Sequence, residues 1–236
     1  MKTKSLFLVL FMFIGLAGQS QALWILIFGD KLTNDRMQSG INIFVTRSDY
    51  NGITNTKPMT SWALGGFSDI KIKNHWNISV EFTVKSPTGA SGLSEHFDHY
   101  EPTDSLSSQN VKLENVNFSL PIYIKYKSKY FNVAVGPEFV YTYKSDLVYT
   151  AKTINSEYIT VKSKSMEEIN RFDYGISSTI EFYLFPKHPN TSIRLGLRYY
   201  YGFNNVLKDY ANARNSVLMF KVGIPIAGKD AVIEKK

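Results

Sequence analysis

Apolar and polar residues alternate along residues 191–203, TSIRLGLRYYYGF. One set is wholly apolar or aromatic and consists of Ile193, Leu195, Leu197, Tyr199, Tyr201 and Phe203. The set between them includes Arg194, Gly196, Arg198 and Gly202. A repeat of two residues predicts a β-strand with two unlike faces. Because the second face is charged but also small, it suits a narrow polar interior. The pattern is therefore typical of a transmembrane β-barrel strand whose apolar face is turned to lipid.

The same alternation recurs in seven further stretches of the chain. The predicted strands are residues 38–45, 60–72, 76–85, 113–126, 130–143, 171–184, 191–203 and 216–226. Most are close to or above the 9–11 residues that a tilted membrane strand needs. Two residues disturb the pattern. Phe67 falls on the polar face of its strand, and Pro121 lacks a ladder donor and predicts a bulge or a weak pairing.

The connections between these strands are alternately long and short. Residues 46–59, 86–112, 144–170 and 204–215 form long polar loops, and residues 73–75, 127–129 and 186–189 form short turns. Short periplasmic turns and longer external loops produce this rhythm in outer-membrane barrels. Within the third long loop, residues 147–153 and 158–164 also alternate, which predicts a hairpin beyond the membrane. Its exposed strand edges would accept a strand from another protein.

The N-terminus is typical of a secretory signal peptide. Lys2 and Lys4 are basic, residues 6–16 are apolar, and Ser20 and Ala22 offer small residues before a cleavage site. We expect cleavage after Ala22, a barrel domain over residues 23–226 and a polar tail over residues 227–236. An uncleaved membrane anchor is the alternative, but the polar residues 18–21 interrupt the apolar run.

The polar faces of the predicted strands carry charges of both signs. The residues expected inside the barrel are Asp69, Lys71, Glu81, Lys85, Lys125, Glu138, Asp173, Glu181, Arg194, Arg198 and Lys221. Side chains fill the interior of an eight-stranded barrel, and isolated buried charges are costly. The nearly balanced signs therefore predict a salt-bridged plug that holds the barrel closed. A conducting or proton-relay role for the same residues is the alternative.

Candidate chemistry is sparse. His96, Asp98 and His99 lie together in the loop 86–112, where histidines and carboxylates would hold a divalent ion. Their spacing matches no strong signature, and polar residues are ordinary in loops. The chain has no cysteine, which excludes disulfides and thiol catalysis. Its formal charge of +7 is spread over turns, strands and tail, so it favours attraction to anionic lipid over nucleic-acid binding.

The chain resembles the PorT-like outer-membrane β-barrel proteins of Gram-negative bacteria. The similarity is carried by LWILIFGDKLTNDRMQSGINIFVTRSDYNGI, residues 23–53, and by LPIYIKYKSKYFNVAVGPEFVYTY, residues 120–143. This resemblance implies an eight-stranded barrel in the outer membrane. The family's namesake takes part in a protein secretion and maturation system, and most relatives have no assigned activity. The shared motifs are structural, so no functional residue follows from them.

These observations predict an all-β fold, a closed antiparallel up-and-down transmembrane β-barrel of about eight strands. We expect a monomeric, non-enzymatic protein of the outer membrane without cofactor, metal or nucleic acid, which contacts lipid and binds a protein partner through its external loops. Two alternatives stay open. A lipid-modifying enzyme at the outer rim would depend on His96 or His99. A soluble exported barrel would turn its aliphatic face inward to hold a small apolar ligand.

Overall fold

The computed structural model describes residues 36–95, 97, 106–153, 157–210 and 212–226. Within them the chain forms nine β-strands in one antiparallel sheet. The strands are β1 (Met37–Asn51), β2 (Lys57–Lys73), β3 (Trp76–Ser91), β4 (Leu106–Lys127), β5 (Phe131–Thr153), β6 (Tyr158–Lys164), β7 (Phe172–Tyr183), β8 (Arg194–Asn205) and β9 (Arg214–Pro225). The predicted signal peptide and the polar tail lie outside the described residues.

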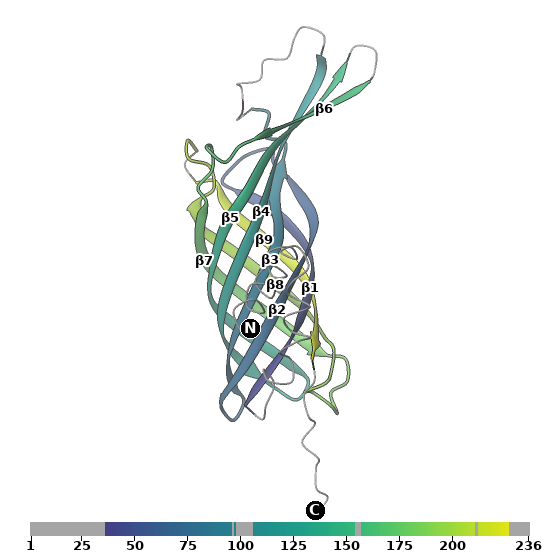
Figure 1. The fold of residues 1–236 in the computed structure, drawn as a ribbon, viewed down its shortest axis with the longest axis vertical. Helices are drawn as coiled ribbons and strands as arrows, with labels where there is room; N and C mark the ends of the chain where they lie inside the picture. The colour runs from purple at the N-terminus through teal and green to yellow at the C-terminus, as the bar shows by residue number, and fades with distance from the viewer. Residues whose placement is uncertain (1–35, 96, 98–105, 154–156, 211, 227–236) are drawn as a thin grey trace, which may run out of the picture.

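Eight of the strands close into a barrel (Figure 1). The strands β1 to β5 pair with one another in sequence order. β5 then pairs with β7, β7 with β8 and β8 with β9, and β9 returns to pair with β1. The predicted closed antiparallel barrel is confirmed. β6 pairs with β5 outside the closed ring. No helix in the described part of the chain is long and apolar enough to span a membrane.

The apolar faces of the strands point out of the barrel. In β7 every second residue is buried and the residues between are exposed. Leu197 of β8 is 50% exposed, whereas Arg194 and Arg198 of the same strand are each 1% exposed. A barrel that holds an apolar ligand would need the opposite arrangement. The alternative of a soluble ligand-binding barrel was therefore wrong, because the aliphatic residues lie outside and the charged residues lie inside.

Several strands extend beyond their predicted ends at the side of the long connections, which we call the long-loop end. The opposite side is the short-turn end. β4 begins at Leu106 and β5 continues to Thr153. Residues 146–152 of β5 pair with β6, which confirms the predicted hairpin. Since β4 also pairs with this part of β5, residues 106–114, 144–153 and 158–164 form a three-stranded sheet, the extension, which rises above the barrel (Figure 1).

β-Bulges interrupt the ladders on both sides of β4. Val84 and Lys85 of β3 fall between the pairs Thr83↔Ser119 and Ser86↔Asn117, where β4 has one residue, Phe118. In β5, Tyr143 falls between the partners of neighbouring β4 residues. A bulge or a weak pairing was predicted at Pro121. No bulge is present, because the register of β4 with both neighbours is the same before and after this residue, but the ladder pairs beside it are interrupted, as a weak pairing predicts.

Candidate functional site

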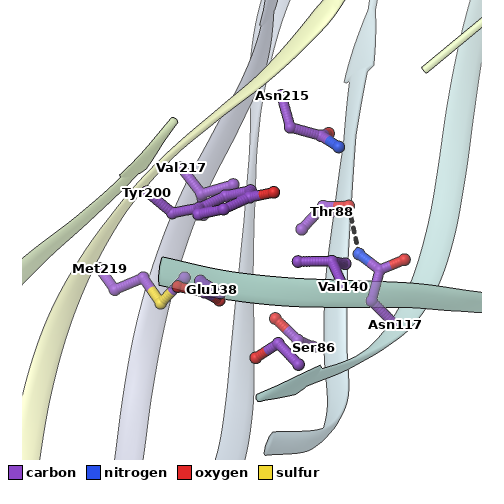
Figure 2. Close-up of a pocket in the computed structure, with 10 residues that line it drawn as sticks. Ser86, Thr88, Asn117, Glu138, Val140, Tyr200, Asn215, Val217 and Met219 are labelled. Carbon is purple, nitrogen blue, oxygen red and sulfur yellow. Dashed lines mark hydrogen bonds between the residues drawn. The ribbon is translucent and has the colours of Figure 1, made fainter. Parts of the chain in front are cut away.

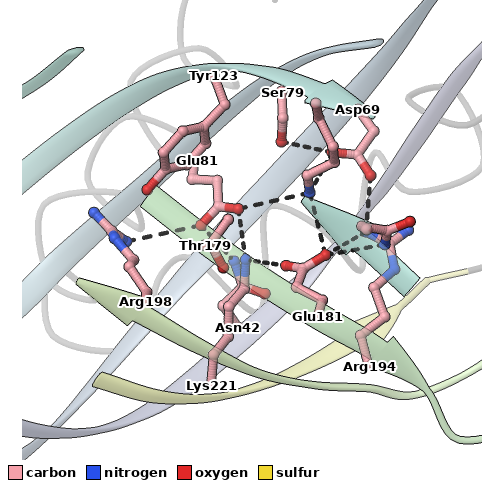
Figure 3. Close-up of polar contacts among 12 residues, drawn as sticks. Asn42, Asp69, Ser79, Glu81, Tyr123, Thr179, Glu181, Arg194, Arg198 and Lys221 are labelled. Atoms are coloured by element: carbon pink, nitrogen blue, oxygen red, sulfur yellow. Dashed lines mark hydrogen bonds and ion pairs between the residues drawn. The ribbon is translucent and has the colours of Figure 1, made fainter. Parts of the chain in front are cut away.

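A layer of paired charges fills the barrel near its short-turn end (Figure 3). It is built from residues that point inward from seven strands, namely Asp69, Glu81, Lys125, Glu138, Glu181, Arg194, Arg198 and Lys221. All of them are at most 1% exposed. The four acids and four bases balance, as buried charges require. β1 contributes Asn42, whose amide donates to Glu81 at 3.2 Å.

Asp69 contacts two cations of this layer and, in addition, Lys127. Arg194 Nη1 lies 2.8 Å from Asp69 Oδ2, and Lys125 Nζ lies 3.1 Å from Oδ1. Lys127 Nζ adds a third contact at 2.8 Å. The hydroxyl of Ser79 donates to the same carboxylate at 2.5 Å. Charge-assisted bonds of this kind are stronger than neutral ones, so Asp69 joins strands β2, β4 and β8 through the interior.

Lys221 joins the two central glutamates. Its Nζ lies 2.5 Å from Glu81 and 2.6 Å from Glu181. Lys125 also approaches Glu181, at 3.4 Å. The amide of Asn132 donates to Glu181 at 3.1 Å. Each glutamate therefore meets more than one positive or donor group, and the layer forms one connected network.

Arg198 links this network to the next level of the barrel. Its Nη2 lies 2.5 Å from Glu138, and its Nη1 lies 3.8 Å from Glu81. Its Nε donates to the hydroxyl of Ser177 at 3.2 Å, and that hydroxyl is also hydrogen-bonded to Tyr123 at 2.8 Å. Both planar edges of the guanidinium are thus in contact with polar groups inside the barrel.

Aromatic rings pack between these charges. Phe67, which disturbed the sequence pattern, is 2% exposed and lies inside the barrel. The Arg194 guanidinium carbon lies 4.6 Å from its ring centroid, and Lys125 Nζ lies 5.8 Å from it. Such cation–π contacts stabilise buried cations. Gly40 makes room for this ring, because a Cβ there would overlap its edge. The apparent irregularity at Phe67 is therefore part of the packing of the charged layer.

Three of the predicted lumen residues do not belong to the charged layer. Lys85 is exposed, because the bulge at Val84 turns its side chain outward, and the prediction that it lines the lumen was wrong. Lys71 was also wrong, since it is exposed where β2 runs into the short turn. Asp173 is buried but lies apart from the charged layer. It accepts hydrogen bonds from Asn215 at 2.8 Å and from the Asn204 backbone at 3.1 Å, and no basic side chain among the described residues pairs with it.

Lys127 is a network residue that the sequence analysis missed. It was assigned to a short turn, yet its ammonium contacts Asp69 and donates to Gln38 Oε1 at 3.1 Å. A signal for it exists in the sequence. Lys127 follows Lys125 by two residues, so both point to the same side if the strand continues.

Above the charged layer the barrel stays filled. Phe44, Ala63, Val140, Tyr200, Val217 and Met219 form an apolar cluster in its middle. A cavity of about 10 Å³ lies beside Tyr200, Glu138 and Asn117 (Figure 2). A volume of this size accommodates about one water molecule. At the long-loop end a second apolar cluster fills the interior and includes Tyr50, Leu93, Leu113, Leu147, Ile169 and Leu207. The interior is therefore packed at three levels.

The extension carries charges on the face that continues the outer surface of the barrel. Glu114 of β4 is paired with Lys112 at 2.7 Å and with Lys162 of β6 at 3.3 Å. Lys144 and Asp146 of β5 form another pair at 2.8 Å. The contact between Lys162 and Glu114 crosses β5 and attaches β6 to β4. The backbone ladder joins β6 only to β5.

His96, Asp98 and His99, the loop residues proposed for metal binding, lie outside the described residues. Within the part of the chain that is described, no group of three or more histidine, cysteine or acidic side chains is placed to hold a metal ion. The arrangement that the described residues do present is a packed, charge-balanced interior beneath a three-stranded extension.

Comparison with known proteins places this geometry in a family. The family described as outer membrane protein beta-barrel domain matches residues 19–208. Among solved structures, the chain is similar to the attachment invasion locus protein Ail of Yersinia pestis, with 10% identity over 81% of this chain and 98% of Ail and a TM-score of 0.39. OprG of Pseudomonas aeruginosa is similar at 11% identity over 81% of this chain and 95% of OprG, with a TM-score of 0.36. A search among curated proteins found no match.

Proposed function

Because the chain belongs to the outer membrane protein beta-barrel domain family and is located in the outer membrane, we propose that it is a non-enzymatic, plugged barrel that binds a partner protein through its extension. Short turns face the periplasm in barrels of this kind, and long loops face outward. The short-turn end is therefore periplasmic and the extension is extracellular.

The packed interior supports a structural role for the barrel itself. The charged layer, the middle apolar cluster and the apolar cluster at the long-loop end follow one another along the lumen. Opening a path would require separating contacts such as Lys221 with Glu81 and Glu181. Separating buried, paired charges is costly. We assign the network the role of holding the barrel closed and rigid beneath the extension.

The observation that carries the binding proposal is the free edge of β6. β6 pairs with β5 through seven residue pairs along one edge. No strand among the described residues covers its other edge. Tyr158 is 72% exposed, Ile159 is 50% exposed and Val161 is 42% exposed. An uncovered edge presents backbone donors and acceptors that an additional strand satisfies.

The composition of this edge supports pairing with another chain. Natural proteins protect exposed edges with lysine, proline or bulges. β6 has lysines only in its second half, at Lys162 and Lys164, and Lys162 is engaged by Glu114. Residues 158–161, YITV, carry no charge and favour the strand conformation. Half of the edge is therefore open to strand addition.

The partner we propose is an extended polypeptide segment with alternating apolar residues. Ile159 is paired with Ala151 and Val161 with Tyr149, so both lie on the face that also carries Leu147. A strand added next to β6 would cover these two side chains with its own apolar residues. The resemblance to PorT-like proteins favours an exported polypeptide as the source of this strand.

Photo-crosslinking in whole cells tests this proposal. A photo-crosslinking amino acid in place of Thr160 lies on the edge strand, and the same amino acid in place of Asp209 lies in an exposed loop of the same end. The edge is then blocked by Ile159→Lys combined with Val161→Lys, since inward-pointing charges prevent strand addition. Asn51→Lys combined with Thr54→Lys adds the same two charges at exposed positions away from the edge.

We expect one partner band that forms from position 160, is absent from position 209, and disappears in the edge-blocked variant but not in the control variant. The proposal fails if the same band forms from both positions, or if it persists when the edge carries the two lysines. A folded barrel of this kind changes its mobility on a gel when the sample is boiled. Retention of this heat-dependent gel shift in each variant shows that the barrel itself is folded.

A further inference from the structure

The apolar part of the outward surface ends at Trp62 of β2, and polar residues follow toward the long-loop end. This side chain is 60% exposed and points away from the lumen. It lies ten residues from Ile72, the last apolar outward residue at the short-turn end of the same strand. At about 3.3 Å per residue this distance is about 33 Å along the strand, which a tilt of about 40° reduces to about 25 Å, the height of the lipid-facing band in such barrels. Trp62 therefore lies at the outer boundary of that band.

Two cations flank this ring on the same surface. Lys85 Nζ lies 5.7 Å from the centroid of the Trp62 ring. Arg47 of β1 is exposed and is the diagonal neighbour of Trp62, because Val45 pairs with Trp62 and Arg47 with Thr60. Neither cation forms an ion pair with an acidic side chain of the described residues. The surface thus presents two uncompensated positive charges beside an aromatic ring at the lipid boundary.

The bulge in β3 places Lys85 there. Without the additional residue at Val84, strict alternation would turn Lys85 into the lumen. The hydroxyl of Tyr143 reaches across β4 and donates to the Val84 carbonyl at 3.1 Å, which satisfies a carbonyl at the bulge. Tyr143 belongs to the bulge of β5 and is itself exposed. Two irregularities in separate strands therefore combine to hold Lys85 on the lipid-facing surface.

We propose that Arg47, Trp62 and Lys85 form a binding site for a phosphate-bearing lipid of the outer leaflet. Indole rings favour the level of the lipid headgroups, where their apolar body meets acyl chains. Arg47 and Lys85 would bind the phosphates at the same level. Asp49, two residues from Arg47 in β1, accepts the backbone N–H of Tyr50 at 2.9 Å and forms no ion pair with either cation, and Asp146 is paired with Lys144.

The location favours lipid over free phosphate as the ligand. The site lies on the outer surface of the barrel at the lipid boundary, so acyl chains of a bound lipid would lie against Trp62 and the apolar residues below it. Each basic residue near a membrane surface strengthens attraction to anionic lipid by about fivefold. Removing both charges is thus expected to weaken binding by roughly 25-fold.

Native mass spectrometry of the purified full-length protein in a non-ionic detergent tests the site. The probes are diphosphoryl lipid A, phosphatidylcholine as a zwitterionic lipid, and inorganic phosphate. The test variant is Arg47→Gln combined with Lys85→Gln. The control is Lys73→Gln combined with Lys187→Gln, which removes two exposed lysines from the short-turn end. All four side chains are exposed, so the barrel folds in both variants, and the heat-dependent gel shift verifies this.

We expect the wild-type protein to bind diphosphoryl lipid A more tightly than phosphatidylcholine. The test variant should lose this preference by roughly 25-fold, and the control should keep it. Equal binding of lipid A by the wild type and the test variant would overturn the proposal, and so would an equal loss in the control. Displacement of lipid A by inorganic phosphate at the same concentration would also overturn it, since the site would then recognise phosphate without lipid.

Discussion

Arg194 and Asp69 are 125 residues apart in the sequence, yet Arg194 Nη1 donates a hydrogen bond to Asp69 Oδ2 at 2.8 Å inside the barrel. Asp69 also contacts Lys125 and Lys127, so one carboxylate pairs with three cations from two other strands. The contact between Arg194 and Asp69 joins β2 to β8 across the lumen. The stability of the closed barrel should therefore depend strongly on this single acid.

Substitution Asp69→Asn tests that dependence. The amide keeps the shape of the side chain but removes its negative charge, and the buried cations around it lose their compensation. Removing one partner of a buried ion pair typically costs about 3–5 kcal/mol. We expect the free energy of unfolding to fall by about that amount, measured by urea unfolding in detergent micelles.

The control for this prediction is Asp209→Asn, which removes an exposed acid from a loop at the long-loop end. It should change the free energy of unfolding by less than about 0.5 kcal/mol. A second variant, Asp69→Asn with Lys125→Met, should recover part of the lost stability because it removes one uncompensated cation. Equal stability of Asp69→Asn and Asp209→Asn would show that the network does not hold the barrel together.

The sequence predicted most of the charged residues that face inward but not which of them meet. A period of two assigns Asp69, Lys125 and Arg194 to the same interior, because successive side chains in a strand alternate between faces. Their heights in the barrel depend on the register between strands, and that register depends on turns and bulges far from these residues. Charge balance predicted that the interior charges would be paired. The individual pairs needed the structure.

Lys85 shows where period-two reasoning fails. A single added residue at Val84 moves every later side chain of β3 to the opposite face relative to the simple pattern. The tyrosine that bonds this bulge lies in β5, so no local feature of β3 indicates it. The sequence analysis also predicted β4 and β5 to be shorter than they are. Polar residues beyond the membrane continue the hydrogen-bonded ladder between these two strands, although the apolar residues that face lipid end at the membrane boundary.

Gly136 of β5 is a position where only glycine fits. A Cβ there would overlap the carbonyl oxygen of Ile122 in β4, and backbone of a paired strand cannot move aside. We expect Gly136→Ala to destabilise the barrel by about 1–3 kcal/mol through overpacking. The midpoint temperature of the heat-dependent gel shift measures the effect.

Gly223 of β9 is the matched control. A Cβ at this position has Asn42 Oδ1 as its nearest neighbour at 3.1 Å and Arg194 Cβ next at 3.5 Å, so it meets side chains that can adjust. Gly223→Ala should leave the midpoint within a few degrees of the wild type, since alanine also reduces the entropy of the unfolded chain. The explanation by overlap would be refuted by a larger loss at Gly223 than at Gly136.

Glu114 gives the extension a dependence on pH. Partial burial would raise the pKa of Glu114, but the hydrogen bonds and charges of Lys112 and Lys162 outweigh it, so the pKa lies below its ordinary value of 4.5. A lowered folded-state pKa means that the contact with Lys162 stabilises β6 above the ordinary pKa and is lost as the pH falls through the folded-state pKa. Lys162 is exposed and Glu114 is only partly buried, so solvent screens the pair and the contribution is at most about 1 kcal/mol.

Hydrogen exchange of the β6 amides in the wild type and in Glu114→Gln measures this contribution. At pH 7 the variant should exchange up to about fivefold faster than the wild type, because β6 has lost its tie to β4. The ratio of the two rates should approach one below the ordinary pKa of glutamate, where the wild type loses the same charge. Taking the ratio removes the intrinsic pH dependence of exchange and any effect of the pair Lys144–Asp146, which both proteins share. A ratio that stays constant from pH 7 to pH 3 would mean that Glu114 does not hold β6. The strand β6 would then be held in place only by its pairing with β5.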